Sequence, residues 1–482
     1  MASGGVYSWE KFFVDGMREI EFSVINQLSN SNTNGKFIVP DYVKSVISLP
    51  LYGTNRTEEF IETKQLLGKI LRTNEFVILN EFVPLFKEFV RNILSSNCDV
   101  ERSANSIYQM HKFLLDHDLK KCFEHPTTWD SFLEFLRDDP DLGEMHLKDA
   151  TNAFQTFQRG LQMISLELPK VDLVHCSLAW MPSFAAICEK KEYGCPIVVT
   201  EHGVAYREQL LNTNLFIDDA IAAKFWKRLA HNIIMTMYHE ADAIVPVCAS
   251  NAVWEVMMGA DQSKIKVIYN GIDTRRFSPM KIETASNRPT IVVVARIDVW
   301  KDIVGLIRAV NIVREQVPDV LCQLYGQSID LDYAIECADL VKELDLEDNF
   351  KFMGRTSEPE VAYNSGDMVV FSGITEGFPF SVIEAMACGK AVVASDVGGV
   401  GEALEGCGLL VRSRSPRDMA DKIVELLRNK ELREKLGKSA LLRARSKFSI
   451  ELSNSEYSNL YDSILSAKSP NQTAIAGILT AR

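Results

Sequence analysis

The sequence predicts an α/β protein with two Rossmann-like domains, each built on a parallel sheet with helices on both faces. In the second half, short β-branched runs alternate with helical stretches of about 10–15 residues, which is typical of consecutive βα units. A length of 482 residues exceeds what one hydrophobic core usually supports. A polar stretch at 278–289, with a proline near each end, separates two series of such units and indicates a domain boundary.

The first domain is expected over residues 1–280. It begins with a helix at 8–18 and strands at 21–26 and 43–49. Apolar stripes at helical spacing then continue through about 57–168 and predict a helical insertion, whose stripe includes Phe82, Leu85, Phe86, Phe89 and Leu94. Beyond the insertion, strands are expected at 171–176, 196–200, 243–247 and 265–269, with helices at 181–190 and 217–240.

The second domain is expected over residues 281–450, with its sheet facing the first across a cleft at the carboxyl ends of the strands. Its strands are predicted at 290–294, 320–325, 350–353, 368–371 and 391–394. Helices are predicted at 303–315, 333–344 and from Ser415-Pro416 to 429. Residues 451–482 are assigned to a C-terminal helix, which could cross back to the first domain, and to a tail without periodicity after about 467.

Composition excludes several classes of protein. The net charge of −13 argues against a nucleic-acid partner, because phosphate contacts need a basic face. Ten cysteines are scattered singly without a Cys-x-x-Cys pair, which favours buried thiols in a reducing cytosol over disulfides or a zinc site. We see no signal segment and no apolar run near the roughly 20 residues that span a bilayer. These features predict a cytoplasmic protein.

Three loops of the second half each follow a predicted strand and carry polar residues. Arg296 and Lys301 follow the strand at 290–294, Arg355 follows the strand at 350–353, and 376–379 follows the strand at 368–371. Because the carboxyl ends of parallel strands meet at one edge of a sheet, these loops are expected to converge. Two fixed cations beside helix N-termini favour a diphosphate ligand. Any one of these residues alone would more often belong to a solvated surface, but their joint placement favours a site.

Two further features frame this expected site. Glu376 lies before the helix that begins near Pro379, and Glu384 lies about a turn and a half inside it, so both can face the same ligand. In the first half, His202 follows an apolar strand at a sheet edge, which favours a functional residue over a core histidine. Tyr206 and Arg207 follow the His202-Gly203 turn, and contact with an acceptor or a solvated loop remain equal alternatives.

Several motifs together resemble a known enzyme family. These are Ala295-Arg296-Ile297-Asp298 with Lys301-Asp302, Asn270-Gly271-Ile272-Asp273, and Glu376-Gly377-Phe378-Pro379 with Glu384. They resemble the retaining, GT-B fold glycosyltransferases of family 4. Nearly the whole chain, to about residue 465, is similar to the cytosolic Pel exopolysaccharide type, which uses UDP-glucose, through Gly4-Gly5-Val6, Ser8-Trp9, Thr200-Glu201-His202-Gly203, Asp332-Tyr333-Ala334-Ile335-Glu336-Cys337 and the helical block.

The resemblance implies a role for each candidate residue. Arg296 and Lys301 would bind the donor diphosphate, and Glu384 would bind the ribose hydroxyls. Glu376, with the backbone of Gly377, Phe378 and Pro379, would bind hydroxyls of the transferred sugar. The resemblance also implies that Arg355 flanks the base, that His202 lies beside the sugar, and that Gly4 and Gly5 let the backbone approach the phosphates.

The implied reaction transfers a hexose, namely glucose from UDP-glucose, to a glycan or small-molecule acceptor with retention of configuration. Front-face attack would pass the acceptor proton to the leaving phosphate. No acidic cluster in a plausible site suggests a metal, so no metal or other cofactor is expected. Peripheral association with a membrane polysaccharide-export complex is left open.

One departure from the family pattern lies at the N-terminus. The resemblance expects a strand before Gly4-Gly5, and only three residues precede them. The first sheet is therefore expected to lack a strand near its middle, leaving the neighbouring strands with unpaired backbone groups. This favours an alternative function, a non-catalytic subunit or scaffold of a polysaccharide biosynthesis or export complex. A third alternative, a two-domain UDP-sugar epimerase, shares the architecture but not the combined motifs.

Overall fold

The computed structural model describes residues 5–30, 42–52, 63–282, 288–328, 330–468 and 475–481. The chain forms two compact units. The first unit comprises Met1–Pro246, Ala252–Val267 and Ser458–Arg482, and the second comprises Val247–Asn251 and Ile268–Tyr457. The chain thus passes into the second unit at Ile268, whereas the sequence predicts the boundary near 280. Its last segment belongs to the first unit.

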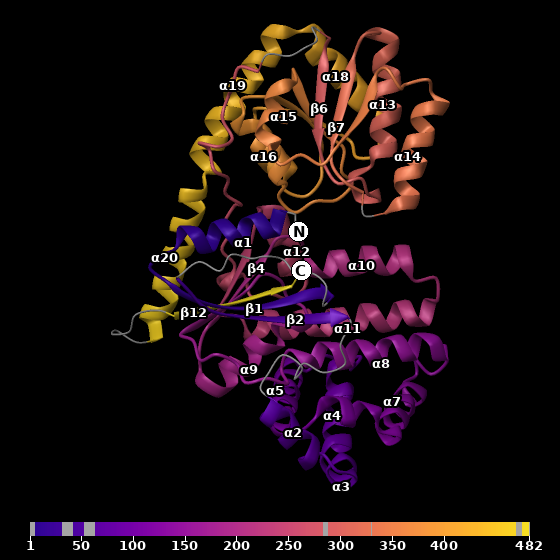
Figure 1. The fold of residues 1–482 in the computed structure, drawn as a ribbon, viewed down its shortest axis with the longest axis vertical. Helices are drawn as coiled ribbons and strands as arrows, with labels where there is room; N and C mark the ends of the chain where they lie inside the picture. Colours follow the sequence, from indigo (N-terminus) through magenta and orange to yellow (C-terminus); the bar gives the residue numbers. More distant parts are fainter. Residues whose placement is uncertain are drawn as a thin grey trace. The chain divides into compact units, whose positions relative to one another are not determined.

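The second unit contains a six-stranded parallel sheet (Figure 1). Its strands are β6 (Thr290–Val294), β7 (Leu321–Tyr325), β8 (Phe350–Gly354), β9 (Met368–Phe371), β10 (Ala391–Ser395) and β11 (Leu409–Val411). They lie in the order β11-β10-β9-β6-β7-β8. The chain therefore moves outward from β6 in one direction through β7 and β8, and then in the other direction from β9. Ligands of such sheets usually bind at the carboxyl ends of the two strands where the direction reverses, which are β6 and β9 in this sheet.

Helices cover both faces of this sheet. They are α13 (Ile303–Gln316), α14 (Leu331–Glu343), α15 (Pro359–Ser365), α16 (Phe380–Ala387), α17 (Val400–Ala403), α18 (Pro416–Arg428) and α19 (Lys430–Lys447). Figure 1 shows α13 and α14 on one side of the strands and α15 and α16 on the other. Alternate residues of each central strand enter two different cores: Ile291 and Val293 of β6 enter one, and Val292 enters the other. The predicted doubly covered parallel sheet is confirmed.

The first unit contains a second six-stranded parallel sheet in the order β2-β1-β12-β3-β4-β5. Its strands are β1 (Glu21–Asn30), β2 (Val43–Tyr52), β3 (Leu173–Cys176), β4 (Ile197–Glu201), β5 (Ala243–Pro246) and β12 (Ile475–Ala481). The strand expected at 265–269 is wrong, because Ile265 forms only an isolated bridge with Ile244 before the chain leaves this unit.

Two layers of helices enclose this sheet. On one face, α1 (Gly5–Gly16) and the end of α20 (Ile450–Lys468) pack Phe13 and Tyr461 around the buried His175 of β3. On the other face, a single core joins the strands to α9 (Phe184–Tyr193), α11 (Ala220–Glu240) and the insertion. The remaining helices of this unit include α10 (Ala205–Phe216) and α12 (Ala249–Met257), which begins in the second unit.

The helical insertion lies where the stripes predict it. It comprises α2 (Thr63–Arg72), α3 (Glu75–Val77), the π-helix η2 (Ile78–Phe82), α4 (Val83–Ile93), α5 (Val100–Asp116), α6 (Leu119–Glu124), α7 (Pro126–Asp138) and α8 (Leu147–Gln162). The predicted stripe residues Phe82, Phe86 and Phe89 are fully buried. Phe86 packs against Phe123 and Phe154 with ring centroids 5.3 and 5.9 Å apart, so aromatic contacts join three of the helices.

The expectation of a gap in the first sheet is wrong. β12 lies between β1 and β3 and pairs with both, from Glu21↔Ile475 to Gln27↔Ala481 on one side and from Ala476↔Leu173 to Leu479↔Cys176 on the other. Both neighbours of the expected gap therefore have backbone partners. The sequence indicates only a tail without periodicity at this segment, because the apolar run is short, contains a glycine, and lies nearly 300 residues from β3 in the chain.

Candidate functional site

Backbone and side-chain bonds hold together the loops that follow β6 and β9. The loop after β6 turns into a short 3₁₀ helix, Val299–Lys301, whose N-cap Asp298 accepts hydrogen bonds from the backbone N–H groups of Trp300 and Lys301, each at 3.1 Å. From the loop after β9, the Ile374 N–H donates to the carbonyl oxygen of Trp300 at 2.9 Å, and the Ser372 hydroxyl donates to that of Lys301 at 2.6 Å. The two loops thus form one structural element at the reversal point of the sheet.

Lys301 and Glu376 form the central ion pair of this edge. The Lys301 Nζ lies 2.5 Å from the Glu376 Oε2, and the two side chains are 18% and 23% exposed. The Lys301 ammonium also lies 5.3 Å from the centroid of the Phe371 ring, which ends β9. A cation and an acceptor are therefore held side by side with one flank open to solvent, where a ligand carrying both phosphates and hydroxyls could engage them.

Arg296 adds a second cation from the loop after β6. Its Nε lies 3.1 Å from the Oδ2 of the buried Asp298, while the side chain is 55% exposed. The ion pair directs the base of the guanidinium and leaves its outer N–H groups accessible. Arg355 also follows its strand as expected and is exposed, after Gly354 at φ +74°. Because β7 separates β8 from β6, Arg355 lies on the same edge but farther along it.

The backbone of Glu376, Gly377 and Phe378 is fixed from three directions. The Gly399 N–H donates to the carbonyl oxygen of Gly377 at 2.7 Å, and the Asn270 amide donates to that of Phe378 at 3.1 Å. Gly398 has φ +54°, and a Cβ there would lie 1.8 Å from the Glu376 carbonyl oxygen, so only glycine fits. Sequence reasoning missed these glycines, because their close approach to Glu376 and Gly377 is a tertiary contact.

The helix α16 begins directly after this fixed loop. Pro379 is its N-cap and cannot provide a side-chain cap, so the first backbone N–H groups of α16 are available to an anionic or hydroxylic ligand. Glu384 lies on the same helix, is partly buried, and its Oε2 accepts a hydrogen bond from the hydroxyl of Tyr363 at 2.8 Å. Burial raises the pKa of Glu384 to about 7, whereas the Tyr363 hydroxyl and the Arg276 charge oppose the rise.

The first unit contains the second group of candidate residues. His202 follows β4, is partly buried, and its ring lies edge-on to Trp9 of α1 with centroids 4.5 Å apart. Gly203 packs against the carboxylate of Glu208, which would have to move to admit a Cβ. The alternative that Tyr206 and Arg207 lie in a solvated loop is wrong, because α10 begins at Ala205 and contains both residues in its first turn, and their contact with an acceptor stays a prediction.

The predicted Gly4-Gly5 turn is only partly within the described residues. Gly4 lies outside them, so its approach to the phosphates stays a prediction. Gly5 is the first residue of α1 and provides helix backbone at this position.

A buried carboxyl group, Glu201, closes the turn that contains His202. Its Oε2 accepts from the backbone N–H of Ala205 at 3.2 Å, and its Oε1 accepts from the buried hydroxyl of Tyr238 at 3.0 Å. Burial raises the pKa of Glu201 to about 8. Burial, with the nearby charge of Glu201, raises the pKa of the fully buried Glu255 on α12 to about 9. Sequence reasoning missed this pair because α11, α12 and β4 are distant along the chain.

The buried Glu255 gives a pH-dependent prediction. Because folding raises the pKa of this carboxyl group, the free energy of unfolding should fall as pH rises from the unfolded pKa near 4.5 to about 9. This carboxyl group lowers the free energy of unfolding by up to about 1.4 kcal/mol for each pH unit in that range, and Glu255→Gln is expected to remove this pH dependence. In calorimetry its melting temperature should match the wild type near pH 5 and exceed it near pH 8, whereas exposed Glu81→Gln should show no such divergence.

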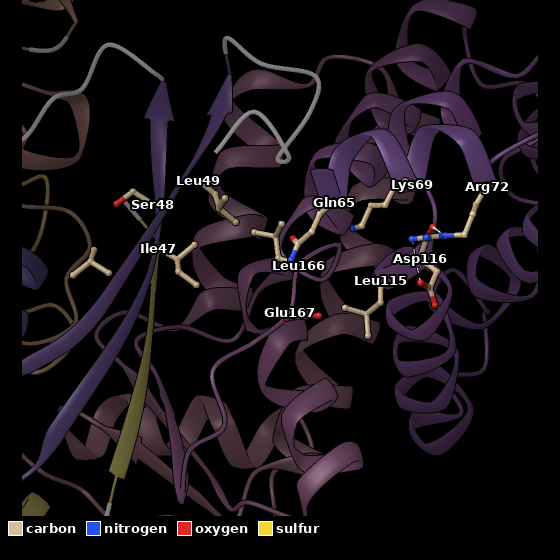
Figure 2. Close-up of a pocket in the computed structure, with 12 residues that line it drawn as sticks. Ile47, Ser48, Leu49, Gln65, Lys69, Arg72, Leu115, Asp116, Leu166 and Glu167 are labelled. Atoms are coloured by element: carbon tan, nitrogen blue, oxygen red, sulfur yellow. Dashed lines mark hydrogen bonds and ion pairs between the residues drawn. The ribbon is translucent and has the colours of Figure 1, made fainter. Parts of the chain in front are cut away.

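A separate cavity of about 720 Å³ lies in the first unit between β2, α2 and the end of α5 (Figure 2). Three of its charged lining residues, Lys69, Arg72 and Asp116, already have protein partners. The Lys69 ammonium donates to the carbonyl oxygens of Leu114 and Ser165 at 2.7 and 2.6 Å, and Arg72 pairs with Asp116 at 3.2 Å. None of the candidate residues from the sequence lines this cavity. This cavity is therefore separate from the candidate residues at the ends of the strands.

Comparison with known proteins identifies the domain in the second half of the chain. Residues 274–443 match the family described as Glycosyl transferases group 1. An N,N'-diacetylbacillosaminyl-diphospho-undecaprenol alpha-1,3-N-acetylgalactosaminyltransferase of Campylobacter jejuni is 26% identical over 266 residues, which cover 52% of this chain and 68% of that protein. A D-inositol 3-phosphate glycosyltransferase of Mycobacteroides abscessus is 28% identical over 273 residues, and the match covers 53% of this chain and only 58% of that protein.

Solved structures share the fold at low sequence identity. Anabaena HepE in complex with UDP and glucose superposes with a TM-score of 0.52 at 22% identity, covering 61% of this chain and 78% of HepE. Sucrose-phosphate synthase from Thermosynechococcus elongatus superposes with a TM-score of 0.53 at 21% identity, covering 72% of this chain and 80% of the synthase.

The two sheets and the domain in the second half define the class of this protein, a glycosyltransferase of GT-B architecture. The chain belongs to the family described as Domain of unknown function (DUF3492), whose model matches residues 1–263.

None of the described helices is long and apolar enough to cross a lipid bilayer. Among the described residues, no group of three or more His, Cys, Asp or Glu side chains has a spacing that could hold a metal ion.

Proposed function

We propose that this protein is a retaining hexosyltransferase that transfers glucose from UDP-glucose to a glycan or small-molecule acceptor. The observation that carries the proposal is the Lys301–Glu376 ion pair at the reversal point of the second sheet, beside Arg296 and the open start of α16. This arrangement offers cations to a diphosphate and acceptors to sugar hydroxyls within one element. This combination of cations and hydrogen-bond acceptors fits a sugar nucleotide better than it fits a free sugar or a free nucleoside diphosphate.

The cations have a direct electrostatic role in the proposed reaction. When the bond between the anomeric carbon and the phosphate oxygen breaks, negative charge grows on the diphosphate and positive charge on the sugar. Lys301 lies against the Phe371 ring and its backbone is bonded to Asp298 and Ser372, so its ammonium needs little reorganisation to turn from Glu376 to the leaving group. The exposed Arg296 supplies the second positive charge. We propose that these side chains suffice without a metal, so a chelator should leave the rate unchanged.

Glu376 would exchange partners when the donor binds. A phosphate that engages Lys301 competes for the ammonium and frees the Glu376 carboxylate for hydroxyls of the transferred sugar. The fixed backbone of 377–379 and the first N–H groups of α16 would orient the same sugar. Retention would follow from attack of the acceptor hydroxyl on the face that the phosphate leaves, with its proton passing to the leaving phosphate oxygen.

His202 is proposed to assist the transfer from the first unit. Its position at the carboxyl end of β4, in a turn fixed by Glu201 and Gly203, matches the position of a substrate-contacting residue in a parallel sheet. His202→Ala is expected to lower kcat about 10²-fold, the typical cost of one lost stabilising contact in the transition state. Calorimetry should show unchanged UDP affinity, because the cations and Glu384 lie in the second unit. Equal kcat in the variant and the wild type would contradict this role.

A donor screen tests the proposed reaction. Release of UDP from UDP-glucose should exceed release of nucleoside diphosphates from GDP- and ADP-sugars, and the product should retain the donor's anomeric configuration by NMR. Preference for another sugar nucleotide would correct the donor, and an inverted product would contradict retention.

The non-catalytic alternative rested on an incomplete first sheet. With β12 paired on both sides, that observation no longer favours it. Its test is nevertheless simple, because a scaffold would release no nucleoside diphosphate with any donor or acceptor.

A further inference from the structure

We propose that Tyr363 is a positioning residue for nucleotide binding, which holds one carboxylate oxygen of Glu384 so that the other is presented to ligand hydroxyls. The inference rests on the proposed function, because it assigns Glu384 to the ribose of a sugar nucleotide. It adds a residue of α15 that the sequence motifs did not indicate. One consequence is that the affinity for the donor depends on pH, because the protonation of Glu384 changes with pH.

The geometry favours this role over simple core packing. Tyr363 is fully buried beneath α16, and its hydroxyl donates its single proton to the Glu384 Oε2 at 2.8 Å. Burial raises the pKa of Tyr363 well above its ordinary value, so the hydroxyl remains a donor throughout the physiological range. Glu384 itself is only partly buried. One carboxylate oxygen is thus committed to the protein, while the side chain still reaches solvent.

Four titratable or charged groups lie near Glu384, and the first three of them influence its pKa. From α15 these are the Tyr363 hydroxyl and the Glu360 carboxylate, from the loop after Asp273 the Arg276 guanidinium, and from the end of α16 the Cys388 thiol. Arg276 and Glu360 are themselves paired at 2.9 Å. Burial is the largest influence and raises the pKa of Glu384 to about 7. The Tyr363 bond and Arg276 lower it, and Glu360 raises it.

The ionised carboxylate is the better acceptor for two neighbouring hydroxyls, because protonation removes one acceptor position. Donor binding should therefore tighten as pH rises through about 7. Removing the Tyr363 hydroxyl should shift the midpoint upward, since a bond that favours the charged form is lost. A residue that served only to fill the core would change stability without moving this midpoint.

Calorimetric binding of UDP-glucose without acceptor, from about pH 5.5 to about pH 8.5, tests the inference, because the donor's diphosphate diester does not titrate in that range. Tyr363→Phe should raise the midpoint by about one pH unit and weaken binding about fivefold at pH 7. Arg276→Gln should also raise the midpoint, and Glu360→Gln should lower it. Tyr325→Phe is the matched control, since its hydroxyl bonds the side chain of Gln323 instead.

Two further arms separate this inference from the proposed function. In Glu384→Gln the pH dependence should vanish, and adding Tyr363→Phe should then have no further effect. UDP-glucose lacking the 2'-hydroxyl should bind the wild type without the pH response. A wild-type midpoint that Tyr363→Phe leaves unmoved, in a folded variant, would overturn the positioning role. Failure of the wild type to bind UDP-glucose at any pH would instead overturn the proposed function.

Discussion

Lys301→Gln is expected to lower kcat about 10³-fold, since it removes a fixed charge from the leaving diphosphate. The structure gives two reasons for so large an effect. Lys301 is held by Glu376 at 2.5 Å and lies against the Phe371 ring, so it is preorganised. Its own backbone is fixed by Asp298 and Ser372, so the side chain begins from a defined position. Steady-state UDP release, at saturating donor where this can be reached, measures the effect.

The control for this variant must separate catalysis from folding. Lys342→Gln removes another lysine of the second unit, which is 66% exposed and pairs with the exposed Asp339 at 3.3 Å, and should retain full activity. Glu376→Gln tests the ion pair itself. Because the two groups act together, the double variant should lose less than the product of the two single losses. Full activity of a folded Lys301→Gln variant would contradict the assigned role.

Deletion of 475–481 is expected to unfold the first unit. β12 pairs with β1 over seven positions and with β3 over four, so its removal leaves two central strands with unpaired backbone groups. The calorimetric transition of the first unit should disappear, and transferase activity should be lost with it. A synthetic peptide of residues 470–482 should restore both in part, whereas a scrambled peptide of equal composition should not.

A point variant tests the same strand without shortening the chain. Gly477→Pro removes a backbone donor in the middle of β12, where Gly477 pairs with both Ser23 and Val174. The expected cost is about 3 kcal/mol or more, because proline is excluded from central strands. Unchanged melting of this variant, or of the deletion, would show that the first sheet does not depend on β12.

The second unit was predictable because its information is local. Each strand is a short β-branched run followed directly by the loop that carries its polar residue, so the residue order alone is enough to place Arg296, Lys301 and Glu376 on one edge. The pairing of Lys301 with Glu376 follows from β6 and β9 being neighbours, which only the strand order reveals. The role of Gly398 likewise depends on a close approach to Glu376 that a single sequence does not indicate.

The first unit was less predictable because its central features join distant segments. β12 neighbours strands that lie hundreds of residues earlier, and its apolar run is too short to identify by periodicity. The beginning of α10 was missed because its hydrophobic face is weakly defined, with only Ala205 and Thr213 buried. The carboxyl pair of Glu201 and Glu255 is likewise assembled by tertiary packing.

Calorimetric titration of the full chain with UDP at neutral pH tests the central claim most directly, since it needs no acceptor. The arrangement of Arg296, Lys301 and Glu384 predicts saturable binding with one site per chain. Binding should be strongly weakened in Lys301→Gln and Glu384→Gln and unchanged in Lys342→Gln. A folded wild-type protein that binds none of UDP, ADP and GDP would contradict the claim that this sheet edge is a sugar-nucleotide site.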